Sequence, residues 1–238
     1  MIASDSISSV LATNTIKTVA KTASVAAVSA DTKDVSPATR DVDSATLSTF
    51  SRQLNDSAAR AESRDNRLDS KQLASLAKDV IEKLTGSSYY GDKAVHDAET
   101  PDTEDPELLE RAIQATRFTN GSGTNPFSGM SLKQLTLIVY DEAGAYTLNE
   151  RKAAYSEKYD QEEVWKRAIC RRYVDEYNET GKSTQTLFMM LAHYNELPPI
   201  EKAQYPDNYA ANLASGDSAV LEALNVSHAS TDSSRINV

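Results

Sequence analysis

Cysteine is nearly absent from this chain: Cys170 is the only one in 238 residues. A single thiol cannot form an internal disulfide, and it excludes a metal site built from several cysteines. Long apolar runs are absent too, since no stretch approaches the ~18 residues of a membrane-spanning helix. The sequence therefore argues against a disulfide-stapled domain and against a membrane span.

Positive charge is in deficit. The chain has 35 Asp and Glu against 25 Lys and Arg, a formal net charge of -10. Binding to nucleic acid or to anionic membranes gains from counterion release only where the protein presents a basic face. We therefore expect no general affinity for nucleic acid, although local basic patches are compatible with this balance.

Aromatic side chains are rare in the N-terminal third. Of the sixteen in the chain, Phe50 is the only one before Tyr89. Aromatic side chains make the largest single contributions of buried apolar surface, so this asymmetry places the folded core in the C-terminal part. The chain is also polar for its length, at 39% hydrophobic residues, and part of it is not expected to pack.

Residues 1–43 are predicted to be a disordered leader. Within residues 1–30 there are ten Ser or Thr and a single acid, Asp5. This composition cannot offset the entropy that ordering costs. It resembles the leaders of substrates of bacterial type III secretion machines, which are Ser/Thr-rich, disordered and not cleaved. An ordinary disordered tail is the alternative.

Two other export signals match less well. A secretory signal needs a continuous apolar stretch, but residues 19–28 are only mildly apolar and are interrupted by Lys21. Organelle transit peptides are rich in arginine and poor in acids, whereas the first arginine here is Arg40. We therefore expect the protein to be cytoplasmic, or secreted without a cleaved Sec signal.

Residues 44–86 are predicted to form a helical hairpin. Apolar residues recur at steps of three and four over residues 47–61 and again over residues 73–84, as on one face of a helix. Asp69 with Gln72 fits a capping box at the start of the second helix. The apolar stripe is narrow and aliphatic, so we expect the hairpin to need a partner surface for stability.

Residues 87–104 are predicted to be an acidic linker. Between residues 92 and 107 there are seven acids and one base, Lys93, and two prolines interrupt the segment. Charge at this density favours solvation over packing. The acids are irregularly spaced and no glycine provides a loop turn, so a linker is favoured over a calcium site.

Residues 105–224 are predicted to form an irregular all-α core domain, followed by a disordered tail at 225–238. No segment alternates with the period of a strand, and helix-start signals recur instead. These signals are Asp105 before Pro106, Ser131 with Gln134, Thr147 with Glu150, and Ser183. The run that Thr147 opens stays helix-compatible for roughly thirty residues, longer than a compact domain of this size, so we expect a break at 159–161.

Residues 141–150 resemble the second half of an EF-hand loop, with Gly144 at the sharp turn and Glu150 at the bidentate position. Two other ligand positions fall on residues without a side-chain oxygen. Asp141 and Glu150 are therefore the only metal-ligand candidates, and two carboxylates are too few for tight calcium binding. The sequence favours a short interhelical turn, in which Gly144 ends one helix and Thr147 with Glu150 caps the next.

Two further motifs have simple explanations. The run Gly181-Lys182-Ser183-Thr184 ends like a phosphate-binding loop, but Glu176 stands where that motif requires a glycine. A basic patch is formed by Lys166, Arg167, Arg171 and Arg172. Glu162 lies four residues before Lys166, and Glu163 lies four residues before Arg167. This spacing favours ion pairs on a solvated helix face.

A catalytic thiol would need a histidine nearby, and His193 is the only one of the three histidines in a predicted helix. Cys170 lies on an apolar face one turn beyond Trp165, which favours a buried structural thiol. We find no catalytic constellation, cofactor motif or complete metal site, and we predict no cofactor.

Five tyrosines are candidates for an aromatic recognition groove: Tyr155, Tyr159, Tyr173, Tyr177 and Tyr194. The interaction candidates are the four aromatic residues Tyr155, Trp165, Tyr173 and Tyr177. Such a stripe is also typical of helix-packing core with hydroxyls at its rim. We predict a non-catalytic helical protein that binds a protein partner, either an exported type III-like bacterial effector or secretion-linked factor, or a cytoplasmic adaptor or regulator. An enzyme without a sequence signature is the third hypothesis, and the sequence does not indicate an oligomeric state.

Overall fold

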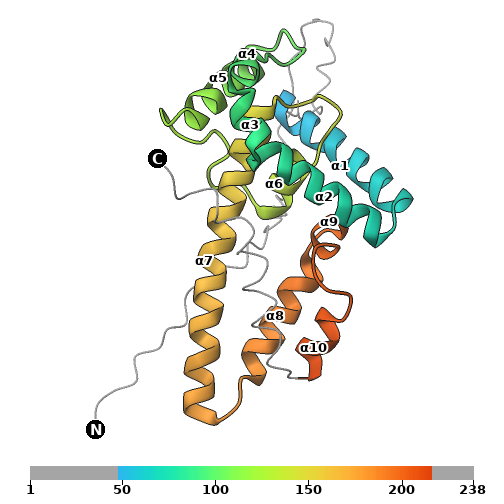
Figure 1. Ribbon diagram of the computed structural model, residues 1–238, viewed down its shortest axis with the longest axis vertical. Helices are drawn as coiled ribbons and strands as arrows, with labels where there is room; N and C mark the ends of the chain where they lie inside the picture. The colour runs from blue at the N-terminus through green and yellow to red at the C-terminus, as the bar shows by residue number, and fades with distance from the viewer. Residues whose placement is uncertain (1–47, 216–238) are drawn as a thin grey trace, which may run out of the picture. The chain divides into compact units, whose positions relative to one another are not determined.

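The computed structural model describes residues 48–215, and these residues form an all-α fold without a strand among them (Figure 1). The helices are α1 (Thr49–Arg67), α2 (Ser70–Thr85), α3 (Ser87–Gly91), α4 (Lys93–Ala98), α5 (Pro106–Thr119), α6 (Leu132–Val139), α7 (Leu148–Thr180), α8 (Thr184–Glu196), α9 (Pro199–Lys202) and α10 (Tyr209–Ser215). The fold class predicted from the sequence is confirmed. The leader at 1–43 and the tail at 225–238 lie outside the described residues and stay predictions.

Local capping signals set the starts of four helices. The capping boxes of α2, α6 and α7 are all formed, with reciprocal bonds between the cap residue and the third helical residue. Asp105 caps α5 by accepting from the backbone N–H of Glu107 at 2.9 Å. Each box fixes two of the N–H groups that a helix start leaves without partners, which is why these starts were readable from the sequence.

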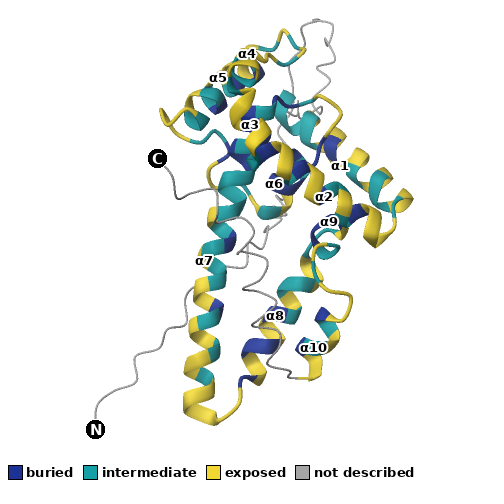
Figure 2. Cartoon of the chain, viewed as in Figure 1, coloured by how far each residue is buried: buried dark blue, intermediate teal, exposed yellow. Residues whose placement is uncertain are grey.

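The apolar stripe of the α1–α2 hairpin is covered by the rest of the chain. Leu73, Ala77, Val80 and Leu84 of α2 belong to the main hydrophobic cluster together with residues of α6, α7 and α9 (Figure 2). The partner surface that the narrow stripe required is therefore intramolecular. The predicted boundary at 87–104 does not separate two cores, because the hairpin and the following helices share this cluster.

The segment predicted as a solvated linker is largely folded. Residues 87–98 form α3 and α4, and Tyr89 is buried with its hydroxyl donating to Oδ1 of Asn149 at 2.6 Å. Glu99 then accepts from the backbone N–H of Leu148, the first residue of α7, at 2.8 Å. The linker prediction failed here because an aromatic anchor and specific polar contacts outweigh the local density of acids.

The break predicted at 159–161 is wrong, since α7 runs without interruption through 33 residues. No proline or glycine interrupts it. Its first half contributes Ala153 and Ala154 to the main cluster. Its second half contributes Ile169 to a second cluster with Leu187, Met190, Tyr209 and Leu213. The helix can be this long because two separate clusters stabilise its two halves.

The start of α8 is predicted correctly but is capped differently from expectation. Gly181 ends α7 in the left-handed conformation at φ 70°. Ser183 then uses its hydroxyl to donate to the carbonyl of Tyr173 at 3.0 Å. The carboxylate of Glu176 caps α8 instead, accepting from the backbone N–H groups of Gln185 and Thr186 at 2.8 Å each. The α7–α8 turn is thus fixed by the Glu176 carboxylate of α7 and by the bond from Ser183 to the Tyr173 carbonyl.

Candidate functional site

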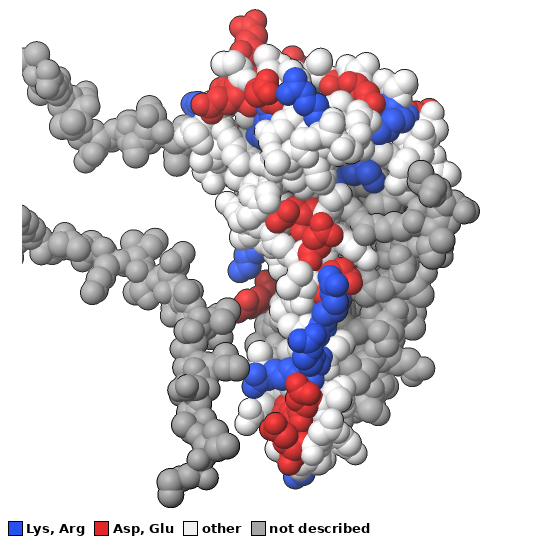
Figure 3. All heavy atoms as spheres, turned by 90° about the vertical axis from the view of Figure 1, so that its left-hand side faces the viewer, with Lys and Arg blue, Asp and Glu red and all other residues white. Residues whose placement is uncertain are grey.

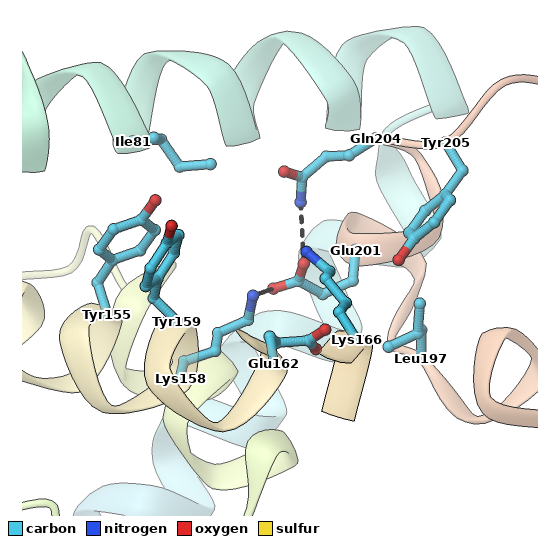
Figure 4. Close-up of a pocket in the computed structure, with 10 residues that line it drawn as sticks. All are labelled: Ile81, Tyr155, Lys158, Tyr159, Glu162, Lys166, Leu197, Glu201, Gln204 and Tyr205. Atoms are coloured by element: carbon cyan, nitrogen blue, oxygen red, sulfur yellow. Dashed lines mark hydrogen bonds and ion pairs between the residues drawn. The ribbon is translucent and has the colours of Figure 1, made fainter. Parts of the chain in front are cut away.

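A pocket of about 130 Å³ lies between α2, α7 and the segment around α9 (Figure 4). Its lining consists of Ile81, Tyr155, Lys158, Tyr159, Glu162, Lys166, Leu197, Glu201, Gln204 and Tyr205. Tyr155, Lys158, Tyr159, Glu162 and Lys166 come from successive turns of α7, so a single helix face supplies half of the lining.

A buried ion pair forms the floor of this pocket. Nζ of Lys158 lies 3.0 Å from Oε1 of Glu201, and both side chains are more than four-fifths buried. Gln204 donates to Oε2 of Glu201 and to the hydroxyl of Tyr140, each at 3.1 Å. Thr136 donates weakly to Oε1 of Glu201 at 3.4 Å. A buried charge persists only where it is paired and hydrogen-bonded, and this carboxylate meets both conditions.

Burial and neighbouring charges together determine the pKa values of the groups around the ion pair. Burial lowers the pKa of Lys158, but the negative charges of Glu201 and Glu162 outweigh it and the pKa is raised. Burial raises the pKa of Tyr140 well above its usual value, with Glu201 acting in the same direction. For Lys166 burial dominates and the pKa is lowered. Lys158 therefore stays positively charged beside Glu201, and Tyr140, which does not line the pocket, stays neutral.

A second pocket, of about 240 Å³, shares Lys158, Glu162 and Glu201 with the first and adds His193. The imidazole of His193 is stacked on Trp165, with ring centroids 3.8 Å apart and planes inclined by 20°. Its Nε2 lies 4.0 Å from Oε2 of Glu162, is buried, and has no hydrogen-bond partner among the described residues. A buried nitrogen without a partner costs about 1–3 kcal/mol.

The pKa of His193 is lowered, chiefly by burial, which disfavours the imidazolium form. The negative charges of Glu162 and Glu196 act in the opposite direction, and Lys166 and Lys158 add to the lowering. At neutral pH the ring is therefore uncharged, and one of its nitrogens is an acceptor.

The four aromatic interaction candidates do not form one groove. Tyr155 packs beside the main cluster, whereas Trp165 and Tyr173 pack beside the second cluster. Tyr177 is the only one of the four that is largely exposed, at 57%. Three of the four candidates therefore pack against the hydrophobic clusters, and Tyr177 lies on the surface.

Asp141 and Glu150, the metal-ligand candidates, are bound to arginines. Asp141 accepts from Nη2 of Arg60 and from the hydroxyl of Ser57, both at 2.6 Å. Glu150 is fully buried and accepts from Nε of Arg111 at 2.7 Å. Burial raises the pKa of Asp141, but these bonds outweigh it and the pKa is lowered. A calcium ion would have to displace both guanidinium groups.

Cys170 does not line the pocket of about 240 Å³ that contains His193. It is half-buried beside the second cluster. A cysteine nucleophile requires a base within hydrogen-bond reach, so this placement favours a structural thiol.

The α7–α8 hairpin carries most of the exposed apolar surface. Eight large hydrophobic side chains are exposed among the described residues, and five of them lie on these two helices: Val164, Val174, Tyr177, Phe188 and Met189. On the face in Figure 3, Lys and Arg gather in a band along α7 with Asp and Glu above and below. Arg167, Arg171 and Arg172 make no ion pair with another described residue. Within residues 48–215, these three arginines are therefore not part of the ion pairs predicted for this face.

The two pockets were not predicted from the sequence. Lys158 and Glu162 are four residues apart on a helix, a spacing that usually indicates a solvated surface pair. Glu201 follows a proline pair and has no distinguishing neighbour. Their burial depends on α8 and α9 folding back along α7, and no short motif carries that information.

No family model, curated protein or solved structure matches the chain. Among the described residues, no helix is both long enough and apolar enough to cross a membrane.

Proposed function

We propose that the protein is a non-catalytic helical interaction protein and that its α7–α8 hairpin binds a protein partner. The observation that carries the proposal is the concentration of exposed apolar side chains on this hairpin. Single exposed hydrophobic residues are normal on any protein, but a group of them on one element is typical of a docking surface.

The partner's chemistry follows from the charges beside these side chains. Val164, Arg167, Arg171 and Val174 are exposed and follow one another at steps of three, four and three, so they share one face of α7. Neither Arg167 nor Arg171 forms an ion pair with another residue of the described range 48–215. We propose that the partner is an amphipathic helix with acidic residues beside its apolar stripe.

The alternative functions have less support. The adaptor hypothesis relied on a free hairpin at 44–86, whereas the apolar stripe of α2 is buried in the main cluster. The enzyme hypothesis relied on Cys170, His193 and a carboxylate around one pocket, and Cys170 is not in the lining of the pocket that contains His193 and Glu162. Export by a type III-like machine stays a proposal based on the Ser/Thr-rich leader. Fusion of residues 1–45 to a reporter tests it, and no transport by a secretion-competent strain would refute it.

The binding proposal can be tested with three fluorescent peptides and the full chain. One peptide is an acidic amphipathic helix of Leu and Glu, the second is its scrambled sequence, and the third replaces Glu by Lys. We expect the acidic helix to bind at least tenfold more tightly than the other two by fluorescence anisotropy. Val174→Asp and Arg171→Glu should each weaken this binding at least tenfold.

Val95→Asp is the matched control, because Val95 is 67% exposed on α4, outside the hairpin. It should leave peptide binding unchanged. Equal affinity for the scrambled peptide, or equal losses in Val95→Asp and Val174→Asp, would refute a hairpin docking site. Tighter binding to single-stranded DNA than to the acidic peptide would point to nucleic acid and would also overturn the proposal.

A further inference from the structure

The charges on the exposed face of α7 change sign twice along the helix. Asp160 is exposed near the middle of the helix, and Asp175 is exposed near its end. Arg167 and Arg171 are exposed between them. These four residues follow one another at steps of seven, four and four, so they share one face with the two exposed valines. Figure 3 shows this order as a band of Lys and Arg between groups of Asp and Glu.

The other charged side chains of this part of α7 keep the same order or lie elsewhere. Four of them extend the order acid, base, acid: Glu157 and Glu163 before the arginines, Arg172 among them, and Glu179 after them. Glu162 and Lys166 line the pocket of about 130 Å³ on the other side of the helix. Glu176 caps α8, and Lys182 lies in the turn between the two helices.

From this order we infer, as a consequence of the function proposed above, that the partner helix carries the inverse order, with acids at its centre and bases near both ends. Its acids would lie opposite Arg167 and Arg171, and its bases opposite Asp160 and Asp175. Complementary charges favour one partner, and like charges brought together disfavour others. Asp160 and Asp175 are about 22 Å apart along the helix axis, so the partner helix needs about sixteen residues.

A second copy of this face is a poorer partner. Two pairings of α7 with a second α7 bring its exposed valines together. The parallel one sets Val164 against itself and therefore Arg167 against Arg167. The antiparallel one sets Val164 against Val174 and therefore Arg167 against Arg171. Both pairings bring like charges together, which favours a different chain as the partner.

The charge order can be tested with two fluorescent peptides of identical composition and the full chain. Both are amphipathic helices with the same stripe of Leu. One has Glu at its centre and Lys near both ends, and the other has Lys at its centre and Glu near both ends. We expect the first to bind about tenfold more tightly at 50 mM salt by fluorescence anisotropy. At 1 M salt the Debye length is about 3 Å, so the two affinities should become similar.

Asp175→Lys should reduce this preference about threefold, because the basic end of the first peptide would then meet a base. Glu62→Lys on α1 makes the same change in net charge and should leave the preference unchanged. Circular dichroism checks that both variants are folded.

Equal binding of the two peptides at 50 mM salt would overturn the inference, as would a preference that persists at 1 M salt or in Asp175→Lys. The hairpin docking site itself would stand if the helix of Leu and Glu alone still bound tenfold more tightly than its scrambled form. If no amphipathic helix bound, the docking site and the charge order would both be refuted.

Discussion

At the scale of single residues, the guanidinium of Arg111 is a largely buried charge. It lies against three rings, 4.6 Å from the centroid of Phe50, 5.6 Å from Phe127 and 5.3 Å from Tyr146. Its charge is paired with the fully buried Glu150 at 2.7 Å. Glu150, which resembled the last ligand of a calcium loop in the sequence, thus joins α7 to α5 through its ion pair with Arg111.

Removal of one partner of this pair should be strongly destabilising. We expect Glu150→Ala to lower the free energy of unfolding by about 3–5 kcal/mol, because Arg111 would stay buried without a counter-charge. Urea unfolding measures the change. Arg111→Met combined with Glu150→Ala should cost less than Glu150→Ala alone. Glu142→Ala, which breaks an exposed pair with Lys83, is the control and should cost about 1 kcal/mol or less.

His193 should make stability depend on pH in one direction. Its pKa in the folded protein is lowered from the usual 6.5, mainly by burial. Just below pH 6.5 the unfolded chain therefore binds a proton that the folded chain does not, and stability falls as the pH falls through the folded-state pKa. The groups facing the ring are Glu162, Glu196, Lys158 and Lys166.

We expect His193→Gln to reduce the loss of stability between pH 7.5 and pH 5.5, measured by urea unfolding at both values. Between pH 7.5 and pH 9 the two proteins should show parallel curves, because His193 is neutral in both states there. A variant whose stability falls as steeply as the wild type below pH 7 would show that other groups account for the acid sensitivity.

At the scale of helices, the α7–α8 connection depends on Glu176. Its carboxylate accepts two backbone N–H bonds and the hydroxyl of Thr186, and the hydroxyl bond is the largest cause of its lowered pKa. We expect Glu176→Ala to increase the hydrogen-exchange rates of the Gln185 and Thr186 amides, measured by NMR. Glu179→Ala, three residues further along α7, should leave both rates unchanged.

The helices also show which parts of the fold the sequence could predict. The capping boxes at Asp69, Ser131 and Thr147 involve residues three apart, so their signals are local and were read correctly. Glu176 caps a helix nine residues away across a turn, and Tyr89 finds its partner Asn149 sixty residues away. Those contacts depend on tertiary packing, which local patterns do not contain.

The candidate site was less predictable for the same reason. Thr136, Lys158, His193 and Glu201 come from α6, α7, α8 and α9, and each is unremarkable in its own segment. The break in α7 was predicted wrongly for the same reason. The prediction of a break was based on helix length alone, whereas two hydrophobic clusters stabilise the two halves of the unbroken helix.

At the scale of the whole molecule, we expect residues 1–40 to be dispensable for folding. The two hydrophobic clusters are formed by residues from Phe50 to Leu213. A chain lacking residues 1–40 should therefore unfold cooperatively, with a melting temperature within a few degrees of the full chain, measured by calorimetry. A broad transition, or a loss of more than ten degrees, would place part of the core in the leader.

The division of α7 between two clusters has a consequence for the order in which parts of the molecule open. The second cluster joins residues between Trp165 and Leu213, so its contacts are short-range along the chain, whereas the main cluster joins residues from Phe50 to Ala203. Short-range contacts re-form quickly after they are lost, because little loop-closure entropy opposes them. The α8–α10 end should therefore open and close as a separate cooperative unit, below the free energy of global unfolding, while the first half of α7 stays helical.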